Sequence, residues 1–422
     1  MKKLIQRLLL SVILMSNIFT VTTKATELPP VYSEGAVLMD AKTSQIIYSK
    51  NENVQYEPAS TTKVMTALIV LEKTKLSDKV TIGKNPTLVD GTAIGIAEGE
   101  VYTVEELLLG LLLESGNDCA EALAEYVAGS NEEFSKLMNA KAKELGALNT
   151  TFKNPSGLHE DGHLTTAYDL ALIMKAAYQN PDYIRISQTE NYKYTNHPFP
   201  DGSEKWAINR NQLFNEYTPY YYSNAYCGKN GYTPEANHTY TATARKNDQF
   251  LIGAFLNATE KDEFYKNIGP LFDYGFDNFE TVKLISKNDV LDKYKVNDEI
   301  TIPLLAKGDL YYTKPKSEKT PPFSIDYSKK NLSTQSISKG ENLFKAKVNV
   351  NGKTISSIDL VSGTDRKYSI NAEVKENISS LLKNPISAVI LIVLLIIIYY
   401  LILSNKKRKL RKRRPKIRKR SI

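Results

Sequence analysis

Apolar and polar positions along the first part of the chain follow the spacing of strands, then that of helices. Residues 34–50 alternate apolar and polar side chains around the turn Asp40-Ala41-Lys42-Thr43, which predicts a hairpin. Residues 62–73 carry apolar side chains at helical spacing, with Ser60 at the predicted helix start. A capping box at residues 103–106 precedes the run 107–113, whose continuous apolar character predicts a buried helix.

The same alternation of helices and strands continues to residue 278. Ser115-Gly116-Asn117 is a predicted bend, and helical spacing resumes over residues 118–127 and 166–178. Residues 239–257 predict two strands joined by a turn at 246–248. Strand groups separated by helices are typical of an antiparallel sheet with a helical cover, so an α/β (α+β) domain is predicted over residues 26–278.

Beyond residue 278 the pattern is that of strands without helices. Residues 296–305, 310–314 and 344–360 are strand-like, and Asn351-Gly352 is typical of a type I′ hairpin turn. A small all-β domain is therefore predicted over residues 285–374.

The two chain ends predict export and a membrane anchor. Residues 1–25 have a positive start, an apolar run and the small residues Thr23 and Ala25, which together are typical of a signal peptide cleaved after Ala25. The apolar run 386–403 would span about 27 Å as a helix, close to the thickness of a hydrocarbon core. The basic tail 404–422 is expected on the cytoplasmic side, which places the folded domains on the extracytoplasmic face of the cell membrane.

Charge and cysteine content narrow the function further. The net charge of +8 arises at the two ends, and because the basic tail adjoins an apolar run, membrane topology explains it better than nucleic-acid binding. With only Cys119 and Cys227, a disulfide framework and a Cys-based metal site are excluded; two separate thiols are expected, although the motifs beside them leave a mutual approach open. The histidines show no ligand spacing, so no metal and no cofactor are predicted. They are His159, His163, His197 and His238.

Three short motifs carry candidate chemistry: Ser60-Thr61-Thr62-Lys63, Ser115-Gly116-Asn117 and Lys229-Asn230-Gly231. Singly, they can also be a capping serine with a solvated lysine, a loop and a tight turn. In combination, helical spacing puts the Ser60 hydroxyl and the Lys63 amine within hydrogen-bonding reach. Lys63 can act as a base if burial or a nearby positive charge, such as that of Lys229, lowers its pKa.

The chain resembles the penicillin-binding proteins, which share these motifs with class A β-lactamases. It is most similar to the D-alanyl-D-alanine carboxypeptidases, because further blocks match them in order over residues 30–276. These blocks are Ala36-Val37-Leu38-Met39-Asp40-Ala41, Pro58-Ala59-Ser60-Thr61-Thr62-Lys63, Ser115-Gly116-Asn117-Asp118, Asn154-Pro155-Ser156-Gly157-Leu158, Gly162-His163-Leu164-Thr165-Thr166-Ala167 and Gly231-Tyr232-Thr233. The resemblance implies the fold of penicillin-recognising serine hydrolases, followed by the β domain.

The resemblance also implies the roles of individual residues. Ser60 would attack the carbonyl between the two terminal D-alanines of a peptidoglycan stem peptide, Lys63 would accept its proton, and Ser115 would pass a proton to the departing D-alanine. The backbone N–H groups of Ser60 and Tyr232 would form the oxyanion hole. β-Lactams would acylate Ser60 in the same way and be released slowly. The substrate-binding residues would be Asn117, Lys229, Asn230, Gly231, Tyr232 and Thr233.

The sequence departs from the family at two places. Asn230 stands where the family has Thr or Ser, and only Lys261 and Lys266 are found where an arginine is usual, so recognition of the terminal carboxylate is affected. A catalytically silent wall-binding homologue is therefore one alternative. A β-lactamase is another, which the predicted anchor and β domain disfavour. A hydrogen-bonding role is expected for His163, and the tyrosines in residues 217–226 either line the cleft or pack.

Overall fold

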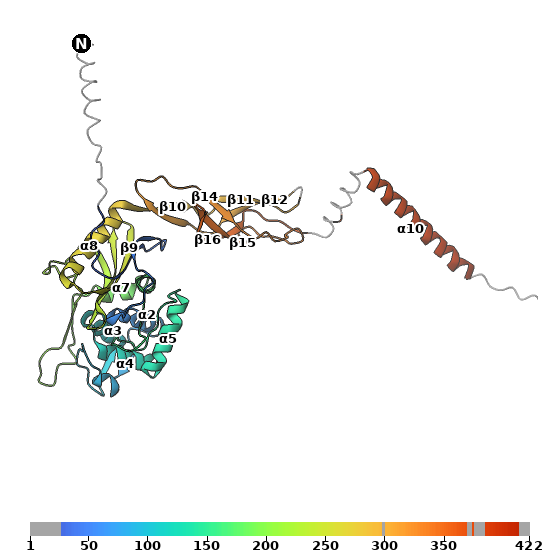
Figure 1. Cartoon of the computed structure of the whole chain (residues 1–422). Coiled ribbons are helices and arrows are strands. Elements are labelled where there is room, and N and C mark those ends of the chain that lie inside the picture. Colours follow the sequence, from blue (N-terminus) through green and yellow to red (C-terminus); the bar gives the residue numbers. More distant parts are fainter. Residues whose placement is uncertain (1–26, 298–299, 369–373, 375–384, 413–422) are drawn as a thin grey trace, which may run out of the picture. The chain divides into compact units, whose positions relative to one another are not determined.

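The computed structural model describes residues 27–297, 300–368, 374 and 385–412 (Figure 1). The predicted signal peptide and the last ten residues of the basic tail lie outside this part of the chain. The chain divides into two compact units: one contains the residues up to Leu284 together with Tyr311–Thr320, and the other contains Ile285–Leu310 and the residues from Pro321 onward.

The first unit is built on a five-stranded sheet in which each pair of neighbours is antiparallel. The order across the sheet is β2 (Ile46–Lys50), β1 (Gly35–Asp40), β9 (Gln249–Ala258), β8 (Asn237–Lys246) and β7 (Ala225–Thr233). The hairpin predicted at residues 34–50 and the strand pair predicted at 239–257 are confirmed. β7 was not predicted, and it forms the edge of the sheet.

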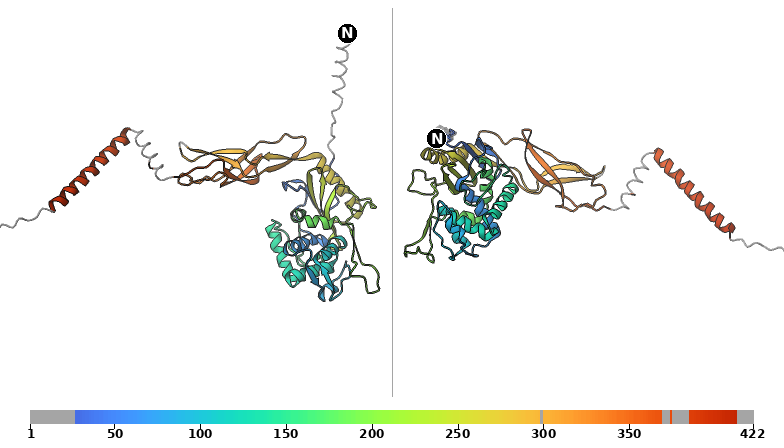
Figure 2. Two further views of the ribbon diagram at one scale, coloured as in Figure 1. Left: turned by 180° about the vertical axis from the view of Figure 1, so that it is seen from behind. Right: turned by 60° about the horizontal axis from the view of Figure 1, so that its bottom comes forward.

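Helices cover both faces of this sheet (Figures 1 and 2). β1 is buried along its whole length: Val37 and Met39 pack into the core of the larger helical group, whereas Leu38 packs with Phe272 of α8 (Lys261–Asn278) on the opposite face. Apolar side chains on both faces are typical of a central strand. The larger group consists of α2 (Lys63–Lys73), α3 (Val104–Leu109), α4 (Asn117–Ala128), α5 (Asn131–Glu144), α6 (Ala167–Ala177) and α7 (Pro181–Ser187).

The predicted helices are present with shifted ends. A 3₁₀ turn, η1 (Ala59–Thr62), precedes α2, and the apolar run 107–113 divides between α3 and a π-helical turn, η3 (Gly110–Glu114). The capping box at the start of α3 is formed as predicted, because the Thr103 hydroxyl accepts from the Glu106 N–H and the Glu106 carboxylate accepts from the Thr103 N–H. α5, α7 and α8 were not predicted.

Short ladders complete the first unit. β3 (Lys79–Thr81) pairs with β4 (Val101–Thr103), and β5 (Asn191–Lys193) pairs with β6 (Trp206–Ile208). β10 (Phe279–Ile285) pairs with β13 (Leu310–Pro315), and Tyr311–Thr320, which lies within the range predicted for the β domain, belongs to the first unit instead. β13 contacts the turn that follows β1. The Lys42 ammonium lies 3.2 Å from the centre of the Tyr311 ring, and the Thr43 and Thr313 hydroxyls are hydrogen-bonded.

The second unit contains the predicted all-β domain. Its sheet has the order β11 (Val290–Lys295), β12 (Thr301–Ala306), β16 (Lys353–Ser362), β15 (Asn342–Val350) and β14 (Phe323–Asp326). β15 and β16 are joined at Asn351 and Gly352, which both have positive φ, at 48° and 75°. Positive φ at both positions confirms the predicted type I′ turn.

The apolar run 386–403 lies within a helix, α10 (Pro385–Lys412). Within the part of the chain that the structure describes, we find no helix with the length and apolar character needed to cross a bilayer. The predicted span is therefore not confirmed.

Candidate active site

Ser60 lies in the tight turn η1, which two buried hydroxyls anchor. The Pro58 carbonyl accepts hydrogen bonds from Thr61 Oγ1 at 2.6 Å and from Thr239 Oγ1 of β8 at 2.9 Å. Ala59, immediately before Ser60, has a left-handed backbone with φ of 47°. A non-glycine residue in this region costs roughly 1–2 kcal/mol, so the surrounding contacts hold the Ser60 turn in a strained conformation.

The edge strand β7 runs directly beside this turn. A Cβ atom placed on Gly231 would lie 2.7 Å from the Ser60 backbone nitrogen and 2.5 Å from Thr239 Oγ1. Only a glycine lets the β7 backbone approach Ser60 so closely. The third predicted motif is thus brought against the first, although 168 residues of numbering separate Lys63 from Gly231.

Lys63 connects the first two motifs through its amine. Its Nζ lies 2.9 Å from Ser60 Oγ, 2.7 Å from Asn117 Oδ1 and 2.7 Å from the Ser156 carbonyl oxygen. An ammonium group can donate to all three acceptors. A neutral amine can donate to Asn117 and Ser156 and present its lone pair to the Ser60 hydroxyl, so both protonation states are accommodated.

The surroundings of Lys63 favour the neutral amine. The side chain is fully buried, and burial, followed by the positive charge of Lys229, holds the pKa of Lys63 well below its usual range. The hydrogen bond and the lowered pKa that the sequence led us to expect are therefore both present.

The second motif follows the π-helical turn η3. Ser115 ends this turn with a left-handed backbone, φ 65°, and Asn117 begins α4. The Asn117 amide is fixed from the far side, because its Nδ2 donates to the Asp90 carbonyl at 2.7 Å and its backbone N–H donates to the Thr92 carbonyl at 2.6 Å. These bonds turn Oδ1 toward Lys63.

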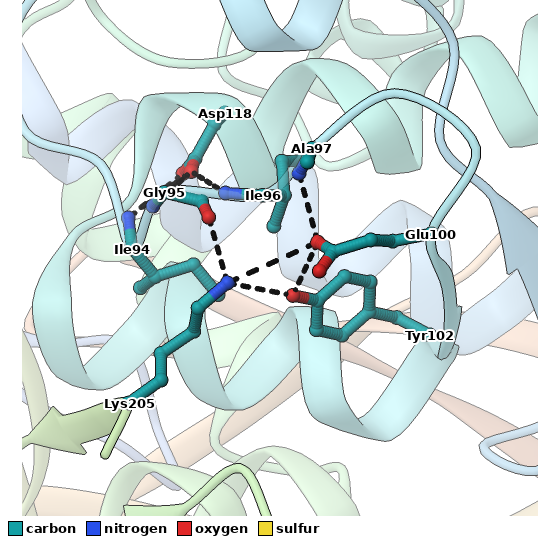
Figure 3. Close-up of polar contacts among 8 residues, drawn as sticks. All are labelled: Ile94, Gly95, Ile96, Ala97, Glu100, Tyr102, Asp118 and Lys205. Atoms are coloured by element: carbon teal, nitrogen blue, oxygen red, sulfur yellow. Dashed lines mark hydrogen bonds and ion pairs between the residues drawn. The ribbon is translucent and has the colours of Figure 1, made fainter. Parts of the chain in front are cut away.

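The loop that supplies these two carbonyls is held by a buried polar cluster (Figure 3). The Asp118 carboxylate accepts backbone N–H groups from Ile94, Gly95 and Ile96. Lys205 Nζ donates to the Gly95 carbonyl at 2.7 Å. Both charged side chains are 2% exposed. Burial makes their hydrogen bonds strong and fixes the loop beside Asn117.

The turn Asn154-Pro155-Ser156-Gly157 aims the Ser156 carbonyl at Lys63. Asn154 Oδ1 accepts the Gly157 N–H at 2.8 Å, and Thr66 Oγ1 of α2 donates to the Pro155 carbonyl at 2.6 Å. Gly157 has φ of 84°, and a Cβ atom there would lie 1.8 Å from the Ala59 carbonyl oxygen. Glycine is therefore required where this turn meets the Ser60 turn.

The remaining predicted binding residues lie along β7. Lys229 is 1% exposed, donates to the Asn230 carbonyl at 2.9 Å, and has its pKa lowered to about 7 by burial, against the opposing effect of Glu114. Asn230 is half-buried, while Tyr232 is 58% exposed. Thr233 ends the strand, where its hydroxyl accepts the Ala236 N–H.

Several secondary predictions agree with the geometry. His163 hydrogen-bonds the Thr62 hydroxyl at 3.0 Å, and burial lowers its pKa to about 4, so it is a neutral hydrogen-bonding group. Cys119 and Cys227 are both free and buried. Lys266 pairs with the exposed carboxylate of Glu263 at 3.4 Å on α8.

The tyrosines in residues 217–226 serve different purposes. Tyr222 stacks on Phe272 with ring centres 6.1 Å apart, whereas Tyr217 is 98% exposed. Some of these residues, with Glu190 and Glu216, also line an open cavity of about 540 Å³. Tyr222 therefore packs, whereas a role of these tyrosines in lining the substrate cleft stays a prediction.

Comparison with known proteins agrees with this arrangement. Residues 22–260 match the family model described as D-alanyl-D-alanine carboxypeptidase, and residues 279–368 match the model for the C-terminal domain of penicillin-binding protein 5. The chain is 37% identical over 270 residues to the D-alanyl-D-alanine carboxypeptidase DacF of Bacillus subtilis, covering 63% of this chain and 67% of that protein. It is 31% identical over 363 residues to DacC of Escherichia coli, covering 79% and 84%.

Among solved structures, the chain is similar to penicillin-binding protein 5 from Haemophilus influenzae, with a TM-score of 0.67 and 26% identity over 81% of this chain and 99% of that one. The family model for residues 22–260 covers more than half of the chain. The chain therefore belongs to the D-alanyl-D-alanine carboxypeptidase family.

Proposed function

We propose that this protein is a serine-type D-alanyl-D-alanine carboxypeptidase that removes the terminal D-alanine from peptidoglycan stem pentapeptides and is inhibited by penicillins. The observation that carries the proposal is the 2.9 Å contact between Ser60 Oγ and the buried amine of Lys63, whose pKa is lowered. A hydroxyl beside a partly neutral amine is an activated nucleophile.

In the proposed reaction, Lys63 takes the Ser60 proton as Oγ attacks the carbonyl carbon of the last peptide bond. The N–H groups of Ser60 and Tyr232 stabilise the oxyanion. The C–N bond then breaks, the departing D-alanine amine receives a proton through Ser115, and an ester remains on Ser60. Water attacks the ester and releases the shortened peptide.

The β7 residues and Asn117 are proposed to hold the substrate. Lys229 attracts the terminal carboxylate, and the segment Asn230–Thr233 lines the path of the peptide. One N–H of Asn117 Nδ2 is engaged with Asp90, which leaves the second for an amide carbonyl of the substrate.

The test is the release of D-alanine from a stem pentapeptide by the parent and by Ser60→Ala. The parent releases D-alanine and takes up a fluorescent penicillin covalently, whereas Ser60→Ala does neither. Ser203→Ala, on the exposed turn between β5 and β6, is the matched control and keeps both activities. Undiminished labelling of Ser60→Ala would overturn the assignment of the nucleophile.

Asn230 is the one observation that favours a second candidate, a wall-binding homologue without turnover. This candidate predicts penicillin labelling without D-alanine release, and a gain of release in Asn230→Thr. Rapid hydrolysis of penicillin would instead indicate a β-lactamase.

We also propose that the protein is exported and anchored in the cell membrane by residues 386–403, with the catalytic unit on the extracytoplasmic face. Support comes from the sequence: an uncharged apolar run followed by a basic tail. Membrane fractionation of the full chain and of a chain ending at residue 384 tests it. Equal recovery of both in the soluble fraction would refute the anchor.

A further inference from the structure

Three side chains that the proposed reaction does not use converge beside the Ser60 turn. They are Glu57, His159 and Glu235, and their ligand atoms all lie within 4.8 Å of one another. Nδ1 of His159 is 2.9 Å and 3.0 Å from the two carboxylate oxygens of Glu57. We propose that these three residues form a binding site for a divalent cation of the zinc type at the edge of the active site.

The donor set suits such a cation. An imidazole nitrogen and carboxylate oxygens bind zinc at about 2.0–2.2 Å, and three protein ligands leave a fourth position open. Ligand atoms around a tetrahedral ion at this distance are about 3.4 Å apart, so the observed separations need only small side-chain movements. Glu235 adds a second carboxylate to the hydrogen-bonded pair of His159 and Glu57.

The net charge of the three side chains also favours the binding of a cation. Even if His159 is protonated, two carboxylates facing one imidazolium leave an excess negative charge, and with a neutral imidazole the excess is larger. A divalent cation offsets this charge. A protonated His159 offsets only one of the two carboxylate charges.

The backbone at each ligand is held in place, as a metal site requires. Glu57 follows Tyr56, which forms two backbone hydrogen bonds with Thr165, at 2.8 and 2.9 Å. Side-chain adjustment at Glu57 therefore starts from a fixed position.

The other two ligands are fixed in the same way. His159 follows Leu158, whose carbonyl accepts from Asn154 Nδ2 at 3.0 Å. Glu235 lies in the turn between β7 and β8, which the hydrogen bond from the Ala236 N–H to the Thr233 hydroxyl closes at 3.0 Å.

The position of the site gives it a consequence for the reaction. Glu57 is three residues before Ser60, His159 is two residues after Gly157, and Glu235 is two residues after Thr233. A bound cation therefore connects the three segments that meet at the Ser60 turn. Occupancy is expected to change the rate at which Ser60 is acylated. The site itself rests on its own ligands and does not depend on the proposed reaction.

Equilibrium dialysis of the full-length, chelator-treated protein against Zn²⁺ tests the proposal. The parent is expected to bind one Zn²⁺ per chain, and His159→Gln and Glu235→Gln to lose at least tenfold in affinity. Glu98→Gln, an exposed carboxylate outside the cluster, is the matched control and binds as the parent does. Mg²⁺ is not expected to compete, because it prefers octahedral oxygen ligands.

Two further measurements distinguish loss of the metal site from loss of the fold and from loss of the nucleophile. The exposed variants should melt at the parent temperature without zinc, and Zn²⁺ should raise the melting temperature of the parent and of Glu98→Gln but not that of His159→Gln or Glu235→Gln. Ser60→Ala should bind Zn²⁺ normally, which separates this site from the nucleophile. The proposal is overturned if the parent binds no Zn²⁺ at millimolar concentration, or if Glu235→Gln binds it as tightly as the parent.

Discussion

Replacing Lys229 with methionine isolates the effect of its charge on Lys63. Methionine has a similar length and is apolar, so it suits a position that is 1% exposed. Because the Lys229 charge is the second cause, after burial, of the lowered pKa of Lys63, its removal must raise that pKa. A like charge beside a buried amine disfavours its protonated form, so the loss of this charge favours protonation of Lys63.

The assay is the second-order rate constant for acylation by a fluorescent penicillin as a function of pH. The acid limb of this profile reports the protonation of Lys63, which must be neutral to accept the Ser60 proton. In Lys229→Met the midpoint of the limb should move to higher pH. At a pH below both midpoints, the rate constant should therefore fall, about tenfold for each pH unit by which the midpoint moves.

The control is Lys175→Met, which removes a partly buried lysine on α6 and should leave the midpoint in place. Weaker penicillin binding in Lys229→Met would lower the whole profile without moving its midpoint. An unmoved midpoint, or one that moves to lower pH, would refute the electrostatic coupling between the two lysines.

The same variant makes a prediction about stability. The pKa of Lys229 is about 7 in the folded protein, against about 10.4 when unfolded, so the unfolded state binds more protons between these values. Its unfavourable contribution is fully present below pH 7 and is relieved as the pH rises toward 10.4. The melting temperature of the parent should gain more over this range than that of Lys229→Met, and equal gains would contradict the lowered pKa.

Three other substitutions test the framework of the site. Gly157→Ala places a Cβ atom 1.8 Å from the Ala59 carbonyl at positive φ, so D-alanine release should fall at least 100-fold in a destabilised protein, and parent-like release would contradict the geometry. Thr239→Val leaves the Pro58 carbonyl without one donor and should lower the free energy of unfolding by about 1–3 kcal/mol in urea titrations; no loss would show that this bond is dispensable. Asp118→Asn turns a carboxylate that accepts several backbone N–H groups into an amide with one acceptor oxygen, and should cost about 2–4 kcal/mol and slow acylation, whereas unchanged rates would show that the loop beside Asn117 needs no such support.

The sequence indicated the parts of the site that have a local signature. Ser60 and Lys63 are joined by helical spacing, and the predicted hydrogen bond between them is present. The resemblance to the family identified the three motifs as parts of one site. Hydrophobic periodicity alone does not connect them. The residue roles drawn from it stay predictions until the variants are measured.

Other parts of the fold and the site carry no such signature. β7 contains Gly228 and Gly231, which weaken a strand pattern, and it is recognisable only through its pairing with β8. The carbonyls of Asp90 and Thr92, which orient Asn117, are backbone groups that any residue would supply.

The remaining contacts join residues that are far apart in the sequence, and the sequence pattern does not predict them. Glu57 and His159 are far apart in sequence, so their contact could not be predicted from a short motif of metal ligands. The hydroxyl of Thr239 reaches Pro58 across an even longer interval. Such contacts follow from the order of strands in the sheet, which puts β8 beside the Ser60 turn.

The pairing of β1 with β9 dictates when the protein can fold. Residues 35–40 are buried on both faces, yet one of their two neighbouring strands ends only at residue 258. A nascent chain must therefore keep an apolar strand unpaired until almost the whole unit has been made, and contacts of this sequence separation form slowly. Chains truncated before β9 would retain β1 with an open edge, and should aggregate rather than fold into a smaller domain.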